Sequence, residues 1–154
     1  MNKKSNQPSR GKILVIEDDE RARGLLRTRL ESFGFEVMCA DSGDQGLKLA
    51  RQEKPSLIIV DIMLPNMNGY QICRLLKFDK RFENIPIIIL TGLQQSKNFQ
   101  TAEEVHADSF LTKPYRAQEL LETIEKLLGK EKAEEKPPNP SLGLIWLDGT
   151  KIAK

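Results

Sequence analysis

The chain has 154 residues, of which 39% are hydrophobic and 30% charged, with a formal net charge of +2. These values are ordinary for a globular domain, and so small a charge gives no reason to expect direct binding to nucleic acid or to a membrane surface. No apolar run approaches the roughly 18 residues of a membrane-spanning helix. Residues 1–10 lack the apolar segment of a signal peptide. We therefore expect one domain with tails, located in the cytoplasm.

Two hydrophobic patterns alternate along the chain. Continuous or alternating apolar runs predict five strands, at residues 13–16, 35–39, 57–60, 86–91 and 109–112. Apolar residues at helical spacing predict five helices, around residues 22–33, 42–52, 72–76, 94–105 and 120–128. Ser42 and Gln45 fit a capping box for the second helix, and Asp19 is expected to cap the first. The arginines of the first helix fit a solvated face.

Strands that alternate with helices, and whose inner members are fully apolar, indicate a parallel sheet covered on both faces. The predicted fold is therefore an α/β, doubly wound, five-stranded parallel sheet with five helices. Right-handed crossovers place all the strand C-termini at one edge of such a sheet. The polar residues at these ends are Glu17, Asp18, Asp61, Thr91 and Lys113.

The chemistry of these five residues points to phosphoryl transfer. Three carboxylates in one crevice repel one another, by on the order of 4 kcal/mol for a pair about 4 Å apart at an effective dielectric near 20. Lys113 offsets part of this charge, and an oxygen-only ligand set favours Mg²⁺ for the rest. Asp61 is then the predicted nucleophile, with Thr91 donating its hydroxyl to a phosphoryl oxygen.

A family resemblance rests on four motifs that occur in order. They are Leu14-Val15-Ile16-Glu17-Asp18, Val60-Asp61-Ile62-Met63-Leu64-Pro65, Leu90-Thr91-Gly92 and Phe110-Leu111-Thr112-Lys113-Pro114. Residues 11–130 resemble bacterial response-regulator receiver domains of two-component systems. The resemblance implies the strand order 2-1-3-4-5 and a cis bond between Lys113 and Pro114. It also implies that the chain is not an enzyme, apart from catalysing its own phosphorylation and dephosphorylation.

The resemblance further implies an acyl phosphate at Asp61, received from the phosphohistidine of a sensor kinase or a histidine phosphotransfer protein. The implied Mg²⁺ ligands are Asp18 and Asp61 directly, Glu17 through water, and the backbone carbonyl of Met63. Lys113 would pair with the phosphoryl group. Thr91 and Phe110 would act as the switch that remodels the surface of the fourth helix, fifth strand and fifth helix. That surface would serve a downstream partner, an output domain or a homodimer.

Two apolar residues suggest a long-lived acyl phosphate. Met63 and Leu93 lie two residues beyond Asp61 and Thr91, and neither side chain can orient a hydrolytic water. We predict slow spontaneous dephosphorylation.

Two rival functions use the same fold. A haloacid-dehalogenase-like phosphatase also has an aspartyl nucleophile, but it needs a second acid two residues later, where Met63 stands. A phosphate-independent protein-binding module is the other rival, and it would carry the repulsion of the acids without any use for it.

The ends of the chain are predicted by composition. Residues 1–10 are expected to be a disordered leader. A charged and proline-rich linker is expected at 131–141, although its charged first half could prolong the last helix. Residues 142–154 contain an Asp-Gly turn and could form a hairpin, pack on the domain, form a dimer contact or begin an output segment.

Overall fold

The computed structural model describes residues 9–92 and 107–135. Within them the chain forms five strands and four helices. In chain order these are β1 (Lys12–Ile16), α1 (Glu20–Ser32), β2 (Glu36–Ala40), α2 (Gly43–Glu53), β3 (Leu57–Asp61), α3 (Gly69–Lys77), β4 (Ile87–Thr91), β5 (Ser109–Thr112) and α5 (Ala117–Glu135). Across the described ranges, each helix is too short or too polar to cross a bilayer.

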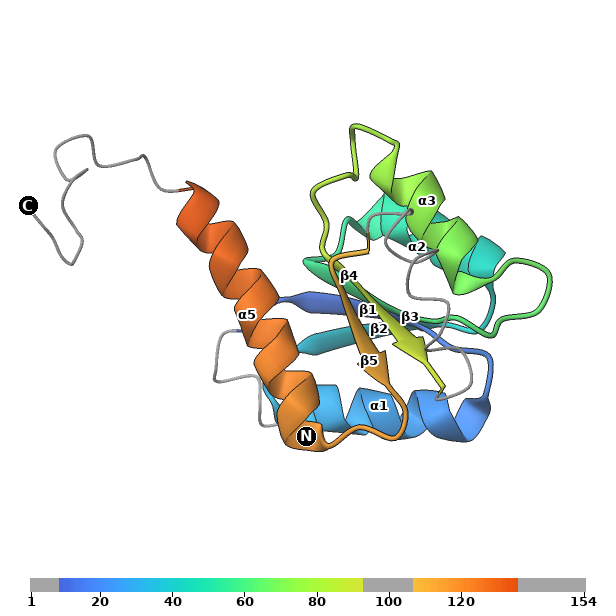
Figure 1. Ribbon diagram of the computed structural model, residues 1–154, viewed down its shortest axis with the longest axis horizontal. Coiled ribbons are helices and arrows are strands. Elements are labelled where there is room, and N and C mark those ends of the chain that lie inside the picture. The colour runs from blue at the N-terminus through green and yellow to red at the C-terminus, as the bar shows by residue number, and fades with distance from the viewer. Residues whose placement is uncertain (1–8, 93–106, 136–154) are drawn as a thin grey trace, which may run out of the picture.

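All five strands belong to one parallel sheet, whose order is β2-β1-β3-β4-β5 (Figure 1). β3 lies at the centre and is buried along its whole length, as is β4. β2 is an edge strand of the sheet. The predicted doubly wound α/β fold and its strand order are confirmed.

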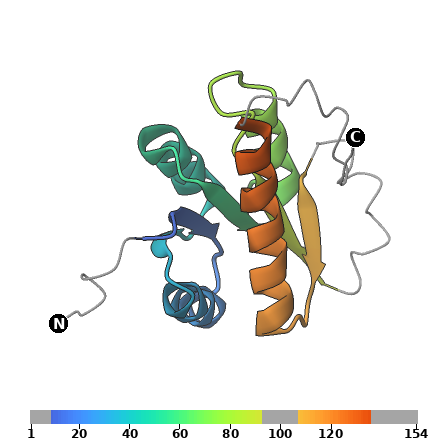
Figure 2. The same ribbon diagram turned by 90° about the vertical axis from the view of Figure 1, so that its left-hand side faces the viewer.

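The helices cover both faces of the sheet (Figures 1 and 2). α1 and α5 pack on one face through Leu26, Leu30, Leu120 and Ile124. α2 and α3 pack on the other through residues such as Ala50, Ile72, Cys73 and Leu76. Because successive residues of a strand point to opposite faces, each inner strand contributes to both cores.

The helix starts are set by polar caps. Asp19 caps α1, as predicted, by accepting the Ala22 N–H at 2.8 Å. For α2 the predicted capping box is only half right: Ser42 accepts the Gln45 N–H at 3.2 Å, but the Gln45 side chain accepts from the N–H of Asp41.

A complete capping box begins α3 and was not predicted. Asn68 accepts the Gln71 N–H at 3.0 Å, and the Gln71 side chain accepts the Asn68 N–H at 2.9 Å. The two bonds satisfy N–H groups that the first turn of a helix otherwise leaves unpaired.

Several boundaries differ from expectation. α5 continues past Gly129 to Glu135, so the charged residues that open the expected linker are helical. Arg10, in the expected leader, is held by the domain through Glu125 at 2.9 Å and the Phe33 carbonyl at 3.1 Å. The predicted fourth helix, the first eight residues and the tail beyond 135 lie outside the described residues.

A partly buried ion pair lies at the N-terminal edge of the sheet. Lys77, the last residue of α3, contacts the Asp108 carboxylate at 2.7 Å. The same ammonium donates to the carbonyls of Glu83 and Ile85 at 3.1 and 2.8 Å, and Asp108 also accepts the Ile87 N–H at 2.8 Å. We call Lys77, Asp108 and these backbone groups the Lys77 cluster. It joins α3 and the loop after it to the starts of β4 and β5.

Candidate functional site

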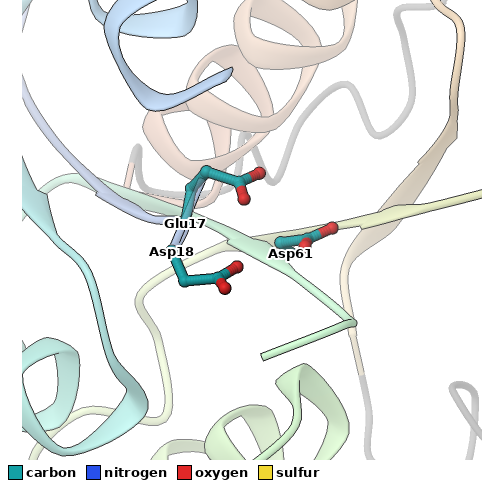
Figure 3. A group of neighbouring side chains, drawn as sticks. All are labelled: Glu17, Asp18 and Asp61. Carbon is teal, nitrogen blue, oxygen red and sulfur yellow. The ribbon is translucent and has the colours of Figure 1, made fainter. Parts of the chain in front are cut away.

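Three carboxylates meet at the opposite, C-terminal edge of the sheet. Glu17 and Asp18 leave the end of β1, and Asp61 is the last residue of the neighbouring strand β3. Each residue offers a carboxylate oxygen that lies within 4.8 Å of the others (Figure 3). Glu17 and Asp61 are 3% and 5% exposed, whereas Asp18 is exposed to solvent. The parallel sheet thus brings together acids that are more than 40 residues apart in the chain.

Lys113 enters the same space from the end of β5. Its ammonium lies 3.1 Å from Oδ1 of Asp61 and 3.6 Å from Oε1 of Glu17. The backbone N–H of Lys113 donates to the carbonyl of Thr91 at 2.7 Å. The bond to Pro114 is cis, as the family resemblance implied. We call Glu17, Asp18, Asp61 and Lys113 the acid cluster.

Burial and charge act in opposite directions on these groups. Burial raises the pKa of Asp61 and of Glu17 above their ordinary values, although the Lys113 charge works against this at both. For Lys113, burial alone would lower the pKa, but attraction to Asp61 and the hydrogen bond with it outweigh burial and raise it. One ammonium therefore faces three carboxylates, and the cluster has a deficit of positive charge.

This donor set fits a hard divalent cation. Carboxylate oxygens are the ligands that Mg²⁺ prefers, and Mg²⁺ binds through one or two carboxylates plus substrate oxygens. Glu17, Asp18 and Asp61 could supply those oxygens. Asp18 remains exposed on one side of the group, which leaves the cluster reachable from solvent.

Thr91 and Phe110, the predicted switch residues, lie on adjacent strands β4 and β5. Thr91 is buried at the end of β4 and pairs in register with Thr112, directly before Lys113. Its hydroxyl donates to the Gly92 carbonyl at 3.2 Å. Phe110 is half-buried and packs against the core on the α2–α3 face.

Two features near the site were not recognised in the sequence. Gly69, at the start of α3, lies so close to the end of β3 that an added Cβ would come within 2.8 Å of the Asp61 carbonyl oxygen. Arg23, assigned to a solvated face, is instead half-buried and donates to the carbonyls of Glu17 and Asp18. A glycine opening a helix just after the acid strand, and an arginine five residues after the acids, were the available signals.

The loop after Asp61 holds Met63, which is 62% exposed. No carboxylate stands at this position, which is where the phosphatase rival needs its second acid. Leu93, its predicted counterpart after Thr91, lies outside the described residues.

The sequence model of one protein family, the response regulator receiver domain, matches residues 13–125 of this chain. This chain belongs to the response regulator receiver domain family. Apart from Lys12, the first residue of β1, the match covers all five strands, and it includes the four acid-cluster residues. It confirms the resemblance inferred from the four motifs. The receiver domain is a component of two-component signal transduction, so neither rival function is favoured.

Curated relatives are regulators of transcription. The chain is 38% identical over 117 residues to the DNA-binding dual master transcriptional regulator RpaA of Synechocystis, covering 76% of this chain and 48% of that protein. It is 34% identical over 142 residues to the probable transcriptional regulator ycf27 of Porphyridium aerugineum, covering 92% of this chain and 58% of that protein. The chain thus spans about half the length of the curated relatives it matches.

Among solved structures, the signal receiver domain of a histidine kinase from Syntrophus aciditrophicus matches with a TM-score of 0.76 and 32% identity. The match covers 84% of this chain and 98% of that one. Receiver domains therefore occur on the same scaffold in regulators and in kinases.

Proposed function

We propose that this receiver domain accepts a phosphoryl group on Asp61 from a phosphohistidine, in a Mg²⁺-dependent reaction. The donor is a sensor histidine kinase or a histidine phosphotransfer protein. The observation that carries the proposal is the contact of Lys113 with Asp61 at 3.1 Å, inside a group of three converging carboxylates. A structural acid would need only one partner, whereas this arrangement places two further acids beside the buried carboxylate of Asp61.

In the proposed reaction a carboxylate oxygen of Asp61 attacks phosphorus. The new bond is the acyl-phosphate P–O bond, the P–N bond of phosphohistidine breaks, and the imidazole leaves with its electron pair and takes up a proton. Lys113 balances charge on the transferred oxygens, and the Thr91 hydroxyl can donate to one of them. Mg²⁺, when bound, supplies positive charge to the phosphoryl oxygens. We assign its ligation to Asp18 and Asp61 directly, to Glu17 through water, and to the Met63 carbonyl.

The proposed output is a change of surface. Movement of Thr91 toward the new phosphoryl group would let Phe110 turn inward, and the face formed by the fourth helix, β5 and α5 would then present a new shape. Support comes from the placement of both residues on neighbouring strands: Thr91 pairs with Thr112, and Phe110 lies two residues before Thr112 on β5. The downstream target is a separate protein, an output domain or a second copy of this chain.

Incubation with acetyl phosphate and Mg²⁺, followed by intact mass spectrometry, tests this proposal. We expect one phosphoryl group per chain, sensitive to hydroxylamine and absent after Asp61→Asn. Asp44→Asn, which changes an exposed aspartate of α2, is the matched control and should be phosphorylated normally. Sustained hydrolysis of a general phosphomonoester would favour the phosphatase rival instead. An intact chain that never gains a phosphoryl group would refute the proposal.

A further inference from the structure

The turn between β1 and α1 carries two of the three acids but has little sheet structure to hold it. The N–H of Glu17 still bonds to the Ala40 carbonyl on β2, at 3.0 Å. Beyond it the chain leaves the sheet, and Asp18 is exposed. The N–H of Asp19 is satisfied by the Glu17 carboxylate at 3.0 Å. The carbonyl groups of the turn need partners from elsewhere.

Arg23 supplies those partners. One nitrogen of its guanidinium, Nη1, donates to the Glu17 carbonyl at 2.9 Å and to the Asp18 carbonyl at 3.3 Å. Side chains on a helix point back toward its N-terminus, so an arginine in the second turn of α1 can reach the turn that precedes the helix. Hydrogen bonds from a charged donor are stronger than those between neutral groups.

We propose that Arg23 is a positioning residue that holds the backbone of Glu17 and Asp18, and so fixes where the Asp18 carboxylate stands relative to Asp61. The inference deepens the proposed function and rests on it. The guanidinium contacts backbone carbonyls, so its action on the acids passes through the backbone of the turn. Arg23 is therefore distinct from Lys113, which touches the carboxylates themselves.

Repulsion among the acids explains why the backbone of this turn must be held in place by Arg23. Asp61 is fixed by β3, and Glu17 is held by β2 and buried. Asp18 is the acid that can most easily move away, because its side chain is exposed and it lies in a turn. The hydrogen bond from Arg23 to the Asp18 carbonyl opposes that movement and keeps the carboxylate in place before a cation binds. Groups that orient metal ligands in this way commonly change metal affinity by 10- to 100-fold when removed.

Calorimetric titration of the full chain with MgCl₂ tests the proposal. Arg23→Gln removes the charge and is too short to span both carbonyls, so we expect Mg²⁺ affinity to fall about tenfold. Arg23→Lys keeps the charge and can reach one carbonyl, so it should recover part of the loss. Arg21→Gln removes the same charge from an exposed neighbour on α1 and should bind Mg²⁺ like wild type.

A second readout separates positioning from general instability. The rate of phosphorylation by acetyl phosphate should show a raised Mg²⁺ requirement in Arg23→Gln, with most of the maximal rate restored at saturating Mg²⁺. Wild-type affinity in Arg23→Gln, or an equal loss in Arg21→Gln, would overturn the proposal. If Arg23→Gln does not fold, Arg23→Lys decides, and unchanged Mg²⁺ affinity in that variant rejects the assignment.

The experiments distinguish a failure of the proposed function from a failure of the role assigned to Arg23. If the wild-type chain binds no Mg²⁺ and gains no acyl phosphate, the proposed function is wrong. If the wild-type chain does both and the Arg23 variants match it, only the role of Arg23 is wrong.

Discussion

The acid cluster and the Lys77 cluster lie at opposite edges of one sheet. They differ in whether their positive and negative charges balance. In the Lys77 cluster one ammonium faces one carboxylate, and two carbonyls and one N–H complete the hydrogen bonds. In the acid cluster one ammonium faces three carboxylates. The first arrangement is balanced, and the second lacks positive charge.

The difference separates a structural ion pair from a reactive one. Lys77 is 8% exposed, and its partners tie a helix, a loop and two strands together. Balanced buried pairs are costly to break, because each partner leaves the other unpaired. Lys113 is more exposed, and its acids have raised pKa values because burial is not fully compensated. In this molecule the balance of charge distinguishes the two clusters, since both contain a lysine paired with an aspartate.

The largest expected effect concerns the two lysines. Lys113→Met should slow phosphorylation by acetyl phosphate by roughly 10²–10³-fold, as expected when a group that stabilises developing charge is removed. Lys77→Met should leave the rate of the folded protein unchanged. Initial rates of adduct formation by intact mass spectrometry measure both. Equal rates in the two variants would remove the distinction between the clusters.

The second prediction concerns stability, on which the Lys77 cluster should have the larger effect. Lys77→Met should lower the free energy of unfolding by roughly 1–3 kcal/mol, because it removes the donor of two carbonyls and the cation beside the partly exposed Asp108 carboxylate. Lys12→Met breaks the exposed pair with Glu53 and should cost less than about 1 kcal/mol. Urea unfolding followed by circular dichroism gives both values. A loss below 1 kcal/mol for Lys77→Met would show that the pair contributes little.

The third prediction concerns the uncompensated charge. In the absence of divalent cations, Glu17→Gln should raise the free energy of unfolding at pH 7, because it removes a charge whose burial is unfavourable. Burial raises the pKa of Glu17 above its ordinary 4.5. The folded chain therefore holds this proton more tightly than the unfolded chain, and stability falls as pH rises from 4.5 through the raised pKa.

The gain from Glu17→Gln should accordingly disappear at pH values below 4.5, where wild-type Glu17 is protonated in both states. Urea unfolding in EDTA at several pH values measures this. Glu36→Gln, at an exposed position of β2, is the matched control for replacing a glutamate by glutamine. A gain that persists in acid would mean that glutamine acts through packing instead of charge.

The smallest expected effect concerns the rate at which water hydrolyses the acyl phosphate. Met63→Asn should shorten the lifetime of the acyl phosphate by a few-fold, well below the roughly 10²–10⁴-fold of a full general base. The exposed Met63 side chain cannot orient water, whereas an amide can. Decay of the adduct after removal of the phosphodonor measures the lifetime, with Met63→Leu as the control. An unchanged or longer lifetime contradicts the hypothesis.

Much of the site could be predicted because its residues end apolar strands. Parallel strands share an edge, so Glu17, Asp61 and Lys113 had to converge once the sheet was recognised. The proximity of the Lys113 ammonium to the acids was predicted, but the distance of 3.1 Å between its nitrogen and Oδ1 of Asp61 depends on side-chain rotamers, which the sequence pattern does not describe.

Arg23 and the Lys77 cluster were missed for related reasons. A charged residue on a helix has the same pattern whether it is solvated or bends back to the preceding turn, so Arg23 was assigned to a solvated face. Lys77 pairs with a residue 31 positions away through an irregular loop, which periodicity does not describe. Leu25 is one of the apolar residues at helical spacing that predicted a helix around residues 22–33, but it is exposed. The buried stripe of α1 is narrower than the apolar pattern suggested.

The close approach of Gly69 to β3 has a consequence for how this sequence can vary. The restriction at Gly69 is steric: any side chain there would push against the Asp61 carbonyl and the Ile62 backbone. In a saturation library selected for phosphoryl acceptance, position 69 should therefore tolerate no replacement, although its own atoms carry no charge and no donor for the phosphoryl group. Intolerance to substitution would then identify a residue that affects the phosphoryl acceptor only because its lack of a side chain leaves space for the end of β3.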